Sequence, residues 1–354
     1  MGGIVGRPKK FQREIERHRV LYEGRDLRRV RNNWVLYWRF LAHLTTIGYR
    51  PRTIESYYTR VGKFIRRLGG KSLRRVRKSD VEQYLDYHKR NRQQVAYTVR
   101  YERQALAMLF RWMMGFCHMK VNPAMGLRMR MYYHQPEKMD LFSKEETVAI
   151  VQAPLRALER IRIAYFPTEW RRQEMRYRLT MHHLLMKLLF STGMRPCEIT
   201  GLEVDDFDAQ ALRLRVRNKG RQQYIVTDRH VFISLRTAEQ LGELLRQSQA
   251  VRGADSRGRL FVHYRGGSPL AVNLLNHVVK KWAGECGIAR NVYAYMTRYT
   301  YCTRLVEGGA DLYSLRKLMG HVQPAVTLKH YLKLTPTEIR KEWKQFNPLA
   351  EGTT

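Results

Sequence analysis

Cysteine, acidic residues and long apolar runs are all scarce in this sequence. The four cysteines stand far apart without a CxxC pair, and the twelve histidines include one adjacent pair, His182 and His183. Zinc sites have ligands at characteristic short spacings, and disulfide frameworks occur in short, cysteine-rich secreted chains, so neither is expected. We predict reduced thiols and no metal or other cofactor; the cysteines are Cys117, Cys197, Cys286 and Cys302.

Long apolar segments are missing along the whole sequence. No stretch reaches the roughly 18 apolar residues of a transmembrane helix. The N-terminal MGGIVGRPKK also lacks the apolar region of a secretion signal. We therefore expect a cytoplasmic protein with no membrane partner.

Acidic residues are far outnumbered by basic ones. The 354 residues include 66 Lys and Arg against 31 Asp and Glu, which gives a formal net charge of +35. Such a charge attracts polyanions, and phosphate neutralisation with counterion release drives binding to nucleic acid. A membrane-surface protein can also be basic, but here the positive residues run through the whole chain. Nucleic acid is therefore the predicted partner, and the expected place in the cell is the nucleoid.

Residues 34–127 have the apolar periodicity of four helices. Thr53 is expected to cap the second helix, and Ser79 with Glu82 to form a capping box at the start of the third. Basic side chains occupy the polar faces with few compensating acids, which favours DNA contact over a merely solvated surface. The candidate DNA-binding residues are Arg60, Lys63, Arg67, Arg100, Arg103 and Arg111.

The segments on either side of this helical region differ from it. Residues 1–33 are basic and are expected to form a partly helical arm or, as readily, a disordered tail. Residues 128–138 have no clear period and are predicted to be a linker. A second capping box, Ser143 with Glu146, marks the start of a domain predicted over residues 139–334.

The second domain contains one clear strand pattern. Residues 212–217 alternate between apolar side chains and arginines, as a half-buried strand does, and Asn218-Lys219-Gly220 is typical of a turn. Strand-like runs follow at 224–226 and 231–235, and the remainder is helical. The predicted fold class is α+β: mostly α with a small antiparallel β-sheet.

Several residues of this domain are suited to chemistry on a phosphodiester. Arg195 follows the apolar helix expected at 184–190, with Glu198 three residues later, and Tyr295-Met-Thr-Arg298 precedes another helical run. An arginine binds phosphate through two hydrogen bonds and stays charged. The acid is placed to orient or neutralise Arg195.

Tyr331 stands ten residues after the pair Gly320-His321. A tyrosine is a poor nucleophile at neutral pH because the pKa of its phenol is about 10. It needs cations on the phosphate and a proton donor for the leaving oxygen. Arg195, Arg298, Lys219 and His321 are residues of the required types.

Four segments in this order resemble the tyrosine recombinase, or phage integrase, family over residues 34–340. TGMRPCEITGL is similar to the family's first-arginine box, and RVRNKGRQQ to its β-hairpin lysine segment. TRYTYCTRLVEGGADLYSLRKLMGH resembles the second-arginine box, and VTLKHY the nucleophile segment. Residues 34–127 resemble the family's helical, SAM-like core-binding domain, which implies that two domains form a C-shaped clamp on DNA.

The resemblance implies a role for each matching residue. Tyr331 would attack the scissile phosphate to form a 3′-phosphotyrosyl bond, and Lys219 would protonate the leaving 5′-oxygen. The other implied roles are phosphate clamping by Arg195 and Arg298, a hydrogen bond to a phosphate oxygen from His321, and support of the site by Glu198. Neither ATP nor a metal is implied.

One position departs from the family pattern. Tyr295 stands where the family usually has histidine, three residues before the second arginine. A phenol donates a hydrogen bond but is a poor base at pH 7, which leaves two other interpretations open. One is a non-catalytic DNA-binding protein of the same fold, and the other is a topoisomerase-like enzyme that nicks and rejoins DNA.

The implied reaction is recombination by a homotetramer on two short inverted sites in double-stranded DNA, with one dimer per site and a Holliday junction intermediate. An accessory DNA-binding protein is a possible partner. The short segment before residue 34 favours a Xer-like, transposon or plasmid type. Residues 335–354 are expected to form a helix and tail that dock on a neighbouring subunit or on their own domain. An extra basic helix is expected within 154–177, contacting DNA or another subunit or simply facing solvent.

Overall fold

The chain folds into two compact units, residues Met1–Lys138 and Met139–Thr354, and each is described here by itself. The computed structural model describes residues 13–17, 26–91, 96–127, 141–160, 168–217, 228–249 and 258–320. The expected turn at Lys219, and the segments with His321, Tyr331 and 335–354, lie outside these residues. The division of the chain into an arm, two domains, a linker and a tail stays a prediction.

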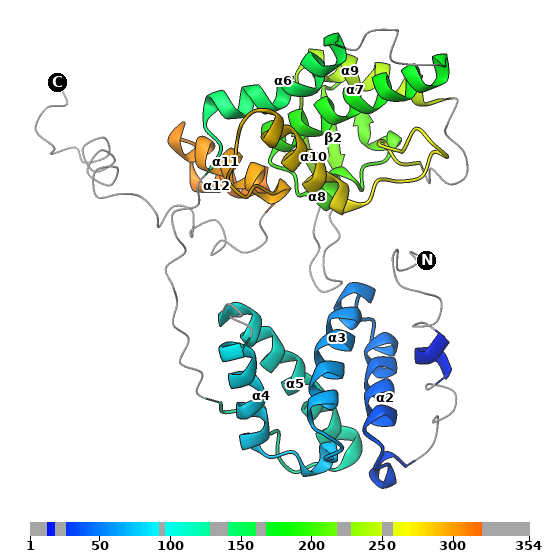
Figure 1. Cartoon of the computed structure of the whole chain (residues 1–354), viewed down its shortest axis with the longest axis vertical. Coiled ribbons are helices and arrows are strands. Elements are labelled where there is room, and N and C mark those ends of the chain that lie inside the picture. The colour runs from blue at the N-terminus through cyan, green and yellow to red at the C-terminus, as the bar shows by residue number, and fades with distance from the viewer. Residues whose placement is uncertain are drawn as a thin grey trace, which may run out of the picture. The chain divides into compact units, whose positions relative to one another are not determined.

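Four helices among the described residues of the first unit form a bundle, which Figure 1 shows. They are α2 (Asn33–Thr46), α3 (Pro51–Arg67), α4 (Lys78–Asn91) and α5 (Ala96–Cys117). Apolar side chains from all four helices meet inside the bundle, where Phe40, Phe64 and Phe110 are fully buried. Ile15, within the short helix at residues 13–17, is buried in the same core.

Two of the helix starts in this unit differ from the sequence predictions. Thr53 is not the cap of α3, because the helix begins at Pro51, whose fixed φ suits the first turn. The box at Ser79 and Glu82 is also wrong. α4 begins at Lys78, and the carboxylate of Asp80 accepts from the backbone N–H of Arg77 at 2.6 Å.

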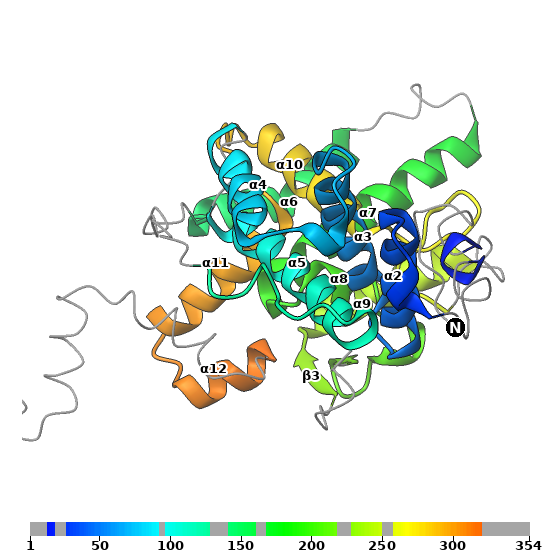
Figure 2. The same ribbon diagram turned by 90° about the horizontal axis from the view of Figure 1, so that it is seen from below.

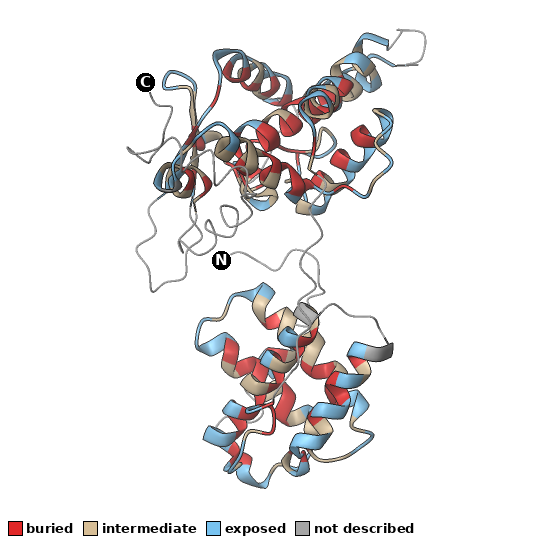
Figure 3. Ribbon diagram, turned by 90° about the vertical axis from the view of Figure 1, so that its left-hand side faces the viewer, coloured by how far each residue is buried: buried red, intermediate tan, exposed pale blue. Residues whose placement is uncertain are grey.

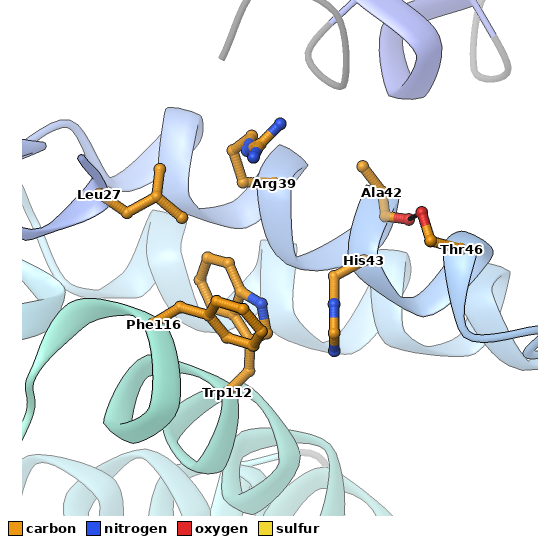
Figure 4. A pocket seen from close by; sticks show the side chains of 7 residues that line it. All are labelled: Leu27, Arg39, Ala42, His43, Thr46, Trp112 and Phe116. Carbon is orange, nitrogen blue, oxygen red and sulfur yellow. Dashed lines mark hydrogen bonds between the residues drawn. The ribbon is translucent and has the colours of Figure 1, made fainter. Parts of the chain in front are cut away.

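A small cleft of about 350 Å³ lies in the first unit between α2 and α5. Trp112 and Phe116 stack with their ring centroids 5.8 Å apart, and the His43 ring lies against Phe116 at 4.9 Å. Arg39 stands at the edge of the same cleft (Figure 4). The cleft is part of the bundle surface and contains none of the predicted catalytic residues.

The second unit packs helices around a small antiparallel sheet, so the predicted α+β class is confirmed. The three strands are ordered β1-β2-β3. Leu214 and Val216 are buried as the alternation predicts, and β2 pairs with β3 from Arg213↔Phe232 to Val216↔Arg229. The strands are β1 (Phe207–Asp208), β2 (Arg213–Val216) and β3 (Arg229–Phe232).

One long helix, α7 (Glu169–Thr192), contributes many buried side chains to the core of this unit. Figure 3 colours the buried residues of the chain red. α7 packs against α6, α9 and α11, and α11 contacts α12, which in turn lies against β3 (Figure 2). The helices are α6 (Lys144–Arg160), α8 (Pro196–Ile199), α9 (Leu235–Ser248), α10 (Val272–Glu285), α11 (Ala294–Glu307) and α12 (Leu312–Met319).

Two predictions about the helices of this unit have opposite outcomes. The capping box before α6 is confirmed: Ser143 Oγ accepts from the N–H of Glu146 at 3.1 Å, and Glu146 accepts from the N–H of Ser143 at 2.9 Å. The extra helix expected within 154–177 is not separate. Its residues Trp170 to Arg172 form the first turn of α7 and are continuous with the core helix.

Among the described residues, no helix is long and apolar enough to cross a membrane.

Candidate functional site

The site begins where α7 ends. Gly193 caps α7 in the left-handed conformation, with φ 59°. A Cβ at this position would lie 2.3 Å from Cδ1 of Tyr301, so only glycine allows the chain to turn here. The turn leads directly to Arg195, which is the N-cap residue of the short helix α8.

Arg195 and Glu198 hold each other through both backbone and side chain. Glu198 Oε2 accepts from the backbone N–H of Arg195 at 2.8 Å, and Arg195 Nη1 donates to Oε1 at 2.7 Å. The side chain of Arg195 keeps 31% of its surface exposed, whereas Glu198 keeps 14%. Glu198 thus orients a cation that a ligand can still reach.

The second predicted arginine, Arg298, lies within α11 and not before the helix as expected. It is 1% exposed and donates from its two terminal nitrogens to the carbonyls of Gly193 and Met319. Burial and the neighbouring Arg195 lower the pKa of its guanidinium to about 10, so Arg298 stays positively charged at neutral pH. It ties the end of α7 to the end of α12.

A third arginine, Arg229 on β3, joins Arg195 and Arg298 in a cluster around Glu198. It was not identified from the sequence. Its Nη1 and Nη2 donate to Oε1 and Oε2 of Glu198 at 3.1 and 2.8 Å. Burial by itself would raise the pKa of Glu198, but Arg229 first and Arg195 second hold it at about 2. No local pattern marks Arg229, because its partner lies 31 residues earlier in the chain.

Tyr295 lies on α11 one turn before Arg298. Its ring packs edge-on against Tyr299, and 37% of the residue is exposed. Burial tends to lower the pKa of Arg195, but Glu198, and then Tyr295, raise it above its ordinary value. The phenol therefore lies close to the exposed cation of the cluster.

The described residues end at Gly320, immediately before His321. Gly320 ends α12 in the left-handed conformation, and its carbonyl lies 3.5 Å from Nη2 of Arg195. Arg195, Glu198, Arg298 and Tyr295 thus come together from two helices. The predicted positions of Lys219, His321 and Tyr331 fall outside the described residues, and their roles stay predictions.

The six candidate DNA-binding residues lie on α3 and α5 of the first unit. Arg67, Arg100 and Arg111 are exposed, and the other three, Arg60, Lys63 and Arg103, are half-buried. The Arg67 guanidinium stacks on the Tyr87 ring at 3.7 Å, and that of Arg60 lies 5.6 Å from the Tyr101 centroid. Aromatic contacts therefore hold two of these cations in place.

Within the described ranges, no group of three or more His, Cys, Asp or Glu side chains is arranged to hold a metal ion. The predicted absence of a cofactor stays a prediction.

Comparison with known proteins identifies the chain's relatives. The model of the phage integrase family matches residues 144–338, which is more than half of the chain. The model of the phage integrase N-terminal SAM-like domain matches residues 36–116. The chain belongs to the phage integrase family. The tyrosine recombinase resemblance in the sequence is thereby confirmed.

Curated relatives of this phage integrase family member are Xer recombinases. Tyrosine recombinase XerD of Corynebacterium glutamicum is 32% identical over 166 residues, which are 47% of this chain and 52% of that protein. Tyrosine recombinase XerC of Bacillus subtilis is 28% identical over 167 residues, which are 47% of this chain and 53% of that protein. The alignments span about half the length of these curated relatives.

Solved structures share the fold of this integrase family member. The Tn1549 transposon integrase in complex with a circular intermediate DNA aligns with a TM-score of 0.66 at 15% identity, over 88% of this chain and 98% of that one. XerH bound to palindromic difH substrate aligns with a TM-score of 0.64 at 16% identity, over 97% of this chain and 99% of that one. These likenesses concern the fold alone.

Proposed function

We propose that the chain is a site-specific DNA recombinase that cleaves and rejoins double-stranded DNA through a covalent tyrosine intermediate. The observation that carries the proposal is the cluster of Arg195, Arg229 and Arg298 around the single carboxylate of Glu198. Three positive charges against one negative charge leave an excess of two. An excess positive charge in a partly buried site stabilises the charge that develops on a phosphate under attack.

The arrangement of the two predicted clamping arginines supports a different role for each of them. Arg195 is the more exposed of the two and is oriented by Glu198. A phosphate oxygen would therefore accept hydrogen bonds from the guanidinium group of Arg195. Arg298 is fixed by two carbonyls and contributes its charge from a buried position, where electrostatic effects are less screened by water.

In the proposed reaction, the Tyr331 oxygen attacks the scissile phosphorus while the bond to the 5′-oxygen breaks. Lys219 gives its proton to that 5′-oxygen, and the Tyr331 proton passes to His321 or water. His321 also hydrogen-bonds a phosphate oxygen. The product is a 3′-phosphotyrosyl bond and a free 5′-hydroxyl.

Attack by the 5′-hydroxyl of another strand would reverse the step and join new partners. Because the bond energy stays in the protein–DNA link, the proposed chemistry needs neither ATP nor a metal.

The proposed substrate is a pair of short inverted sites in double-stranded DNA. One dimer would occupy each site, and a tetramer would exchange strands through a Holliday junction, with an accessory DNA-binding protein as a possible further partner. Relatives named tyrosine recombinases and neighbours solved on DNA support DNA as the substrate. Such a reaction takes place on DNA in the cytoplasm.

The experiment captures the covalent intermediate from a mixture of candidate target sites. The protein is incubated with a pool of nicked duplexes made from the DNA that flanks its gene, and adducts that survive denaturation are collected and sequenced. Adducts should form in EDTA and without nucleotide. Tyr331→Phe should bind DNA and form none, while the control Tyr313→Phe, at a tyrosine 63% exposed on α12, should react normally.

The outcomes separate the proposal from its rivals. Absence of any adduct with the unmodified chain would favour a non-catalytic DNA-binding protein. Adducts that never assemble into a four-subunit complex on paired sites would favour a topoisomerase-like enzyme.

A further inference from the structure

Arg229 shares Glu198 with Arg195 atom by atom. Oε1 accepts from Arg195 Nη1 at 2.7 Å and from Arg229 Nη1 at 3.1 Å. Oε2 accepts from the Arg195 backbone N–H at 2.8 Å and from Arg229 Nη2 at 2.8 Å. The Arg229 side chain is only 11% exposed, so it has less access to solvent than Arg195.

Arg229 also supports the end of α12. An ideal Cβ on Gly320 would lie 2.8 Å from Arg229 Nη1 and 3.0 Å from its Cδ, so the arginine packs directly against this glycine. Helix α12 contacts strand β3 on this side. One side chain therefore links β3, the Glu198 carboxylate on α8 and the C-terminal end of α12.

The shared carboxylate determines how much charge Arg195 offers a ligand. With Arg229 present, one carboxylate divides its two oxygens between two cations. Without Arg229, the buried carboxylate would have Arg195 as its main partner. It would then hold that guanidinium more tightly or take up a proton, because a buried charge that loses one partner is strongly destabilised.

We infer that Arg229 is a positioning residue of the recombination site: it binds Glu198, packs against Gly320 and so leaves Arg195 oriented and available to the scissile phosphate. This inference rests on the proposed function. Arg229 touches no substrate; it acts through Glu198 and Arg195.

The test compares Arg229→Met and Arg229→Lys with a matched control. Arg290 also binds one glutamate through two nitrogens, at 2.6 and 2.5 Å to Glu146 in the same unit, but outside the site. On a nicked duplex recovered by adduct capture, Arg229→Met should form the covalent adduct roughly ten- to a hundredfold more slowly in a single turnover. Arg290→Met should react within about threefold of the unmodified rate. DNA affinity should be unchanged in both variants.

Arg229→Lys keeps the charge but cannot make the two parallel hydrogen bonds. It should therefore react at an intermediate rate, and it serves as the informative variant if Arg229→Met fails to fold.

Two further readouts separate positioning from a merely structural role. In a double-mutant cycle, Arg229→Met and Glu198→Gln together should slow the reaction by much less than the product of their separate effects, because they remove one shared interaction. In addition, the pKa of Glu198 should rise in Arg229→Met, because burial raises this pKa and the arginine that lowers it has been removed. The acid limb of the rate profile should therefore move to higher pH in Arg229→Met but not in Arg290→Met.

Each outcome is decisive. An unmodified chain that forms no adduct would overturn the proposed function and this inference with it. A normal adduct rate in both Arg229 variants would overturn the inference alone. So would independent effects in the cycle, or a loss explained entirely by weaker DNA binding.

Discussion

Tyr295 occupies the position where the tyrosine recombinase resemblance leads us to expect a histidine. Its phenol is partly exposed beside the Arg195 cation, one helical turn before the buried Arg298. If Arg195 holds a phosphate, the neighbouring phenol can donate a hydrogen bond to it. We therefore expect Tyr295 to act as a hydrogen-bond donor.

The first prediction follows from that role. Tyr295→Phe should slow single-turnover cleavage of a nicked duplex by roughly ten- to a hundredfold, the value of one hydrogen bond to a charged group. Arg298→Ala should slow cleavage far more than Tyr295→Phe does, whereas Tyr295→His should keep activity. If Tyr295→Phe is as inactive as Tyr331→Phe, Tyr295 is an essential catalyst and the proposed site is wrong.

A second residue-scale prediction concerns His182 in the core of the second unit. His182 is 8% exposed, and its Nδ1 accepts from Trp282 Nε1 at 3.3 Å. Burial, and then Arg178 and Lys281, lower its pKa from 6.5 to about 4. Between these values the unfolded chain binds a proton and the folded chain does not, so stability falls as pH falls.

The loss should reach about 3 kcal/mol between pH 6.5 and pH 4. Chemical denaturation across this range should show that slope reduced in His182→Asn and kept in the exposed control His277→Asn. An equal slope in all three proteins would contradict the assignment of a buried neutral imidazole.

At the scale of elements, the turn from α7 into α8 places the site. Gly193 supplies the left-handed turn, its carbonyl accepts from Arg298, and Arg195 follows two residues later. The close approach of the Tyr301 ring leaves no space for a side chain at Gly193. The stability of this turn and the geometry of the arginine pair are therefore linked.

Gly193→Ala tests that link. In the left-handed backbone conformation, alanine would lower the stability of the fold by roughly 1–2 kcal/mol relative to glycine. Its Cβ would also displace the Tyr301 ring. Gly287→Ala is the control, because Gly287 has φ 77° with no atom within 4 Å of an added Cβ. Denaturation should show a larger loss of stability for Gly193→Ala than for Gly287→Ala, accompanied by slower cleavage. Equal losses would show that Tyr301 moves away at little cost.

Capping-box patterns in the sequence predicted a helix start correctly where only one starting residue fitted the pattern. The box of Ser143 and Glu146 was predicted correctly, whereas Ser79 and Glu82 fitted the same pattern but α4 begins one residue before Ser79. The pattern alone does not choose between overlapping registers.

In the site, residues within local motifs were predicted, whereas a contact between distant residues was not. Arg195, Glu198 and Arg298 were predicted from motif order, and the structure brings them together. Arg229 was not, because its partner Glu198 lies 31 residues earlier in the sequence. Its place on β3 depends on the pairing of β3 with β2.

At the scale of the whole molecule, the formal charge of +35 should govern DNA affinity. If both units follow phosphates, log K should fall linearly with log salt at a slope of about −0.9 per neutralised phosphate. Titration of labelled duplex over a range of salt concentrations measures the slope. Charge-removing changes at Arg67 and Arg111 should each make it shallower by about 1. A flat dependence would mean that the charge serves another partner.

The proposed reaction requires that one of the 21 tyrosines, Tyr331, becomes joined to DNA. This is measured by mass spectrometry of the trapped adduct after digestion of both protein and DNA, which identifies the residue that carries the nucleotide. We predict a 3′-linked nucleotide on Tyr331, formed in EDTA. A nucleotide on Tyr295 or any other residue, or an adduct that requires magnesium, would contradict the proposed mechanism.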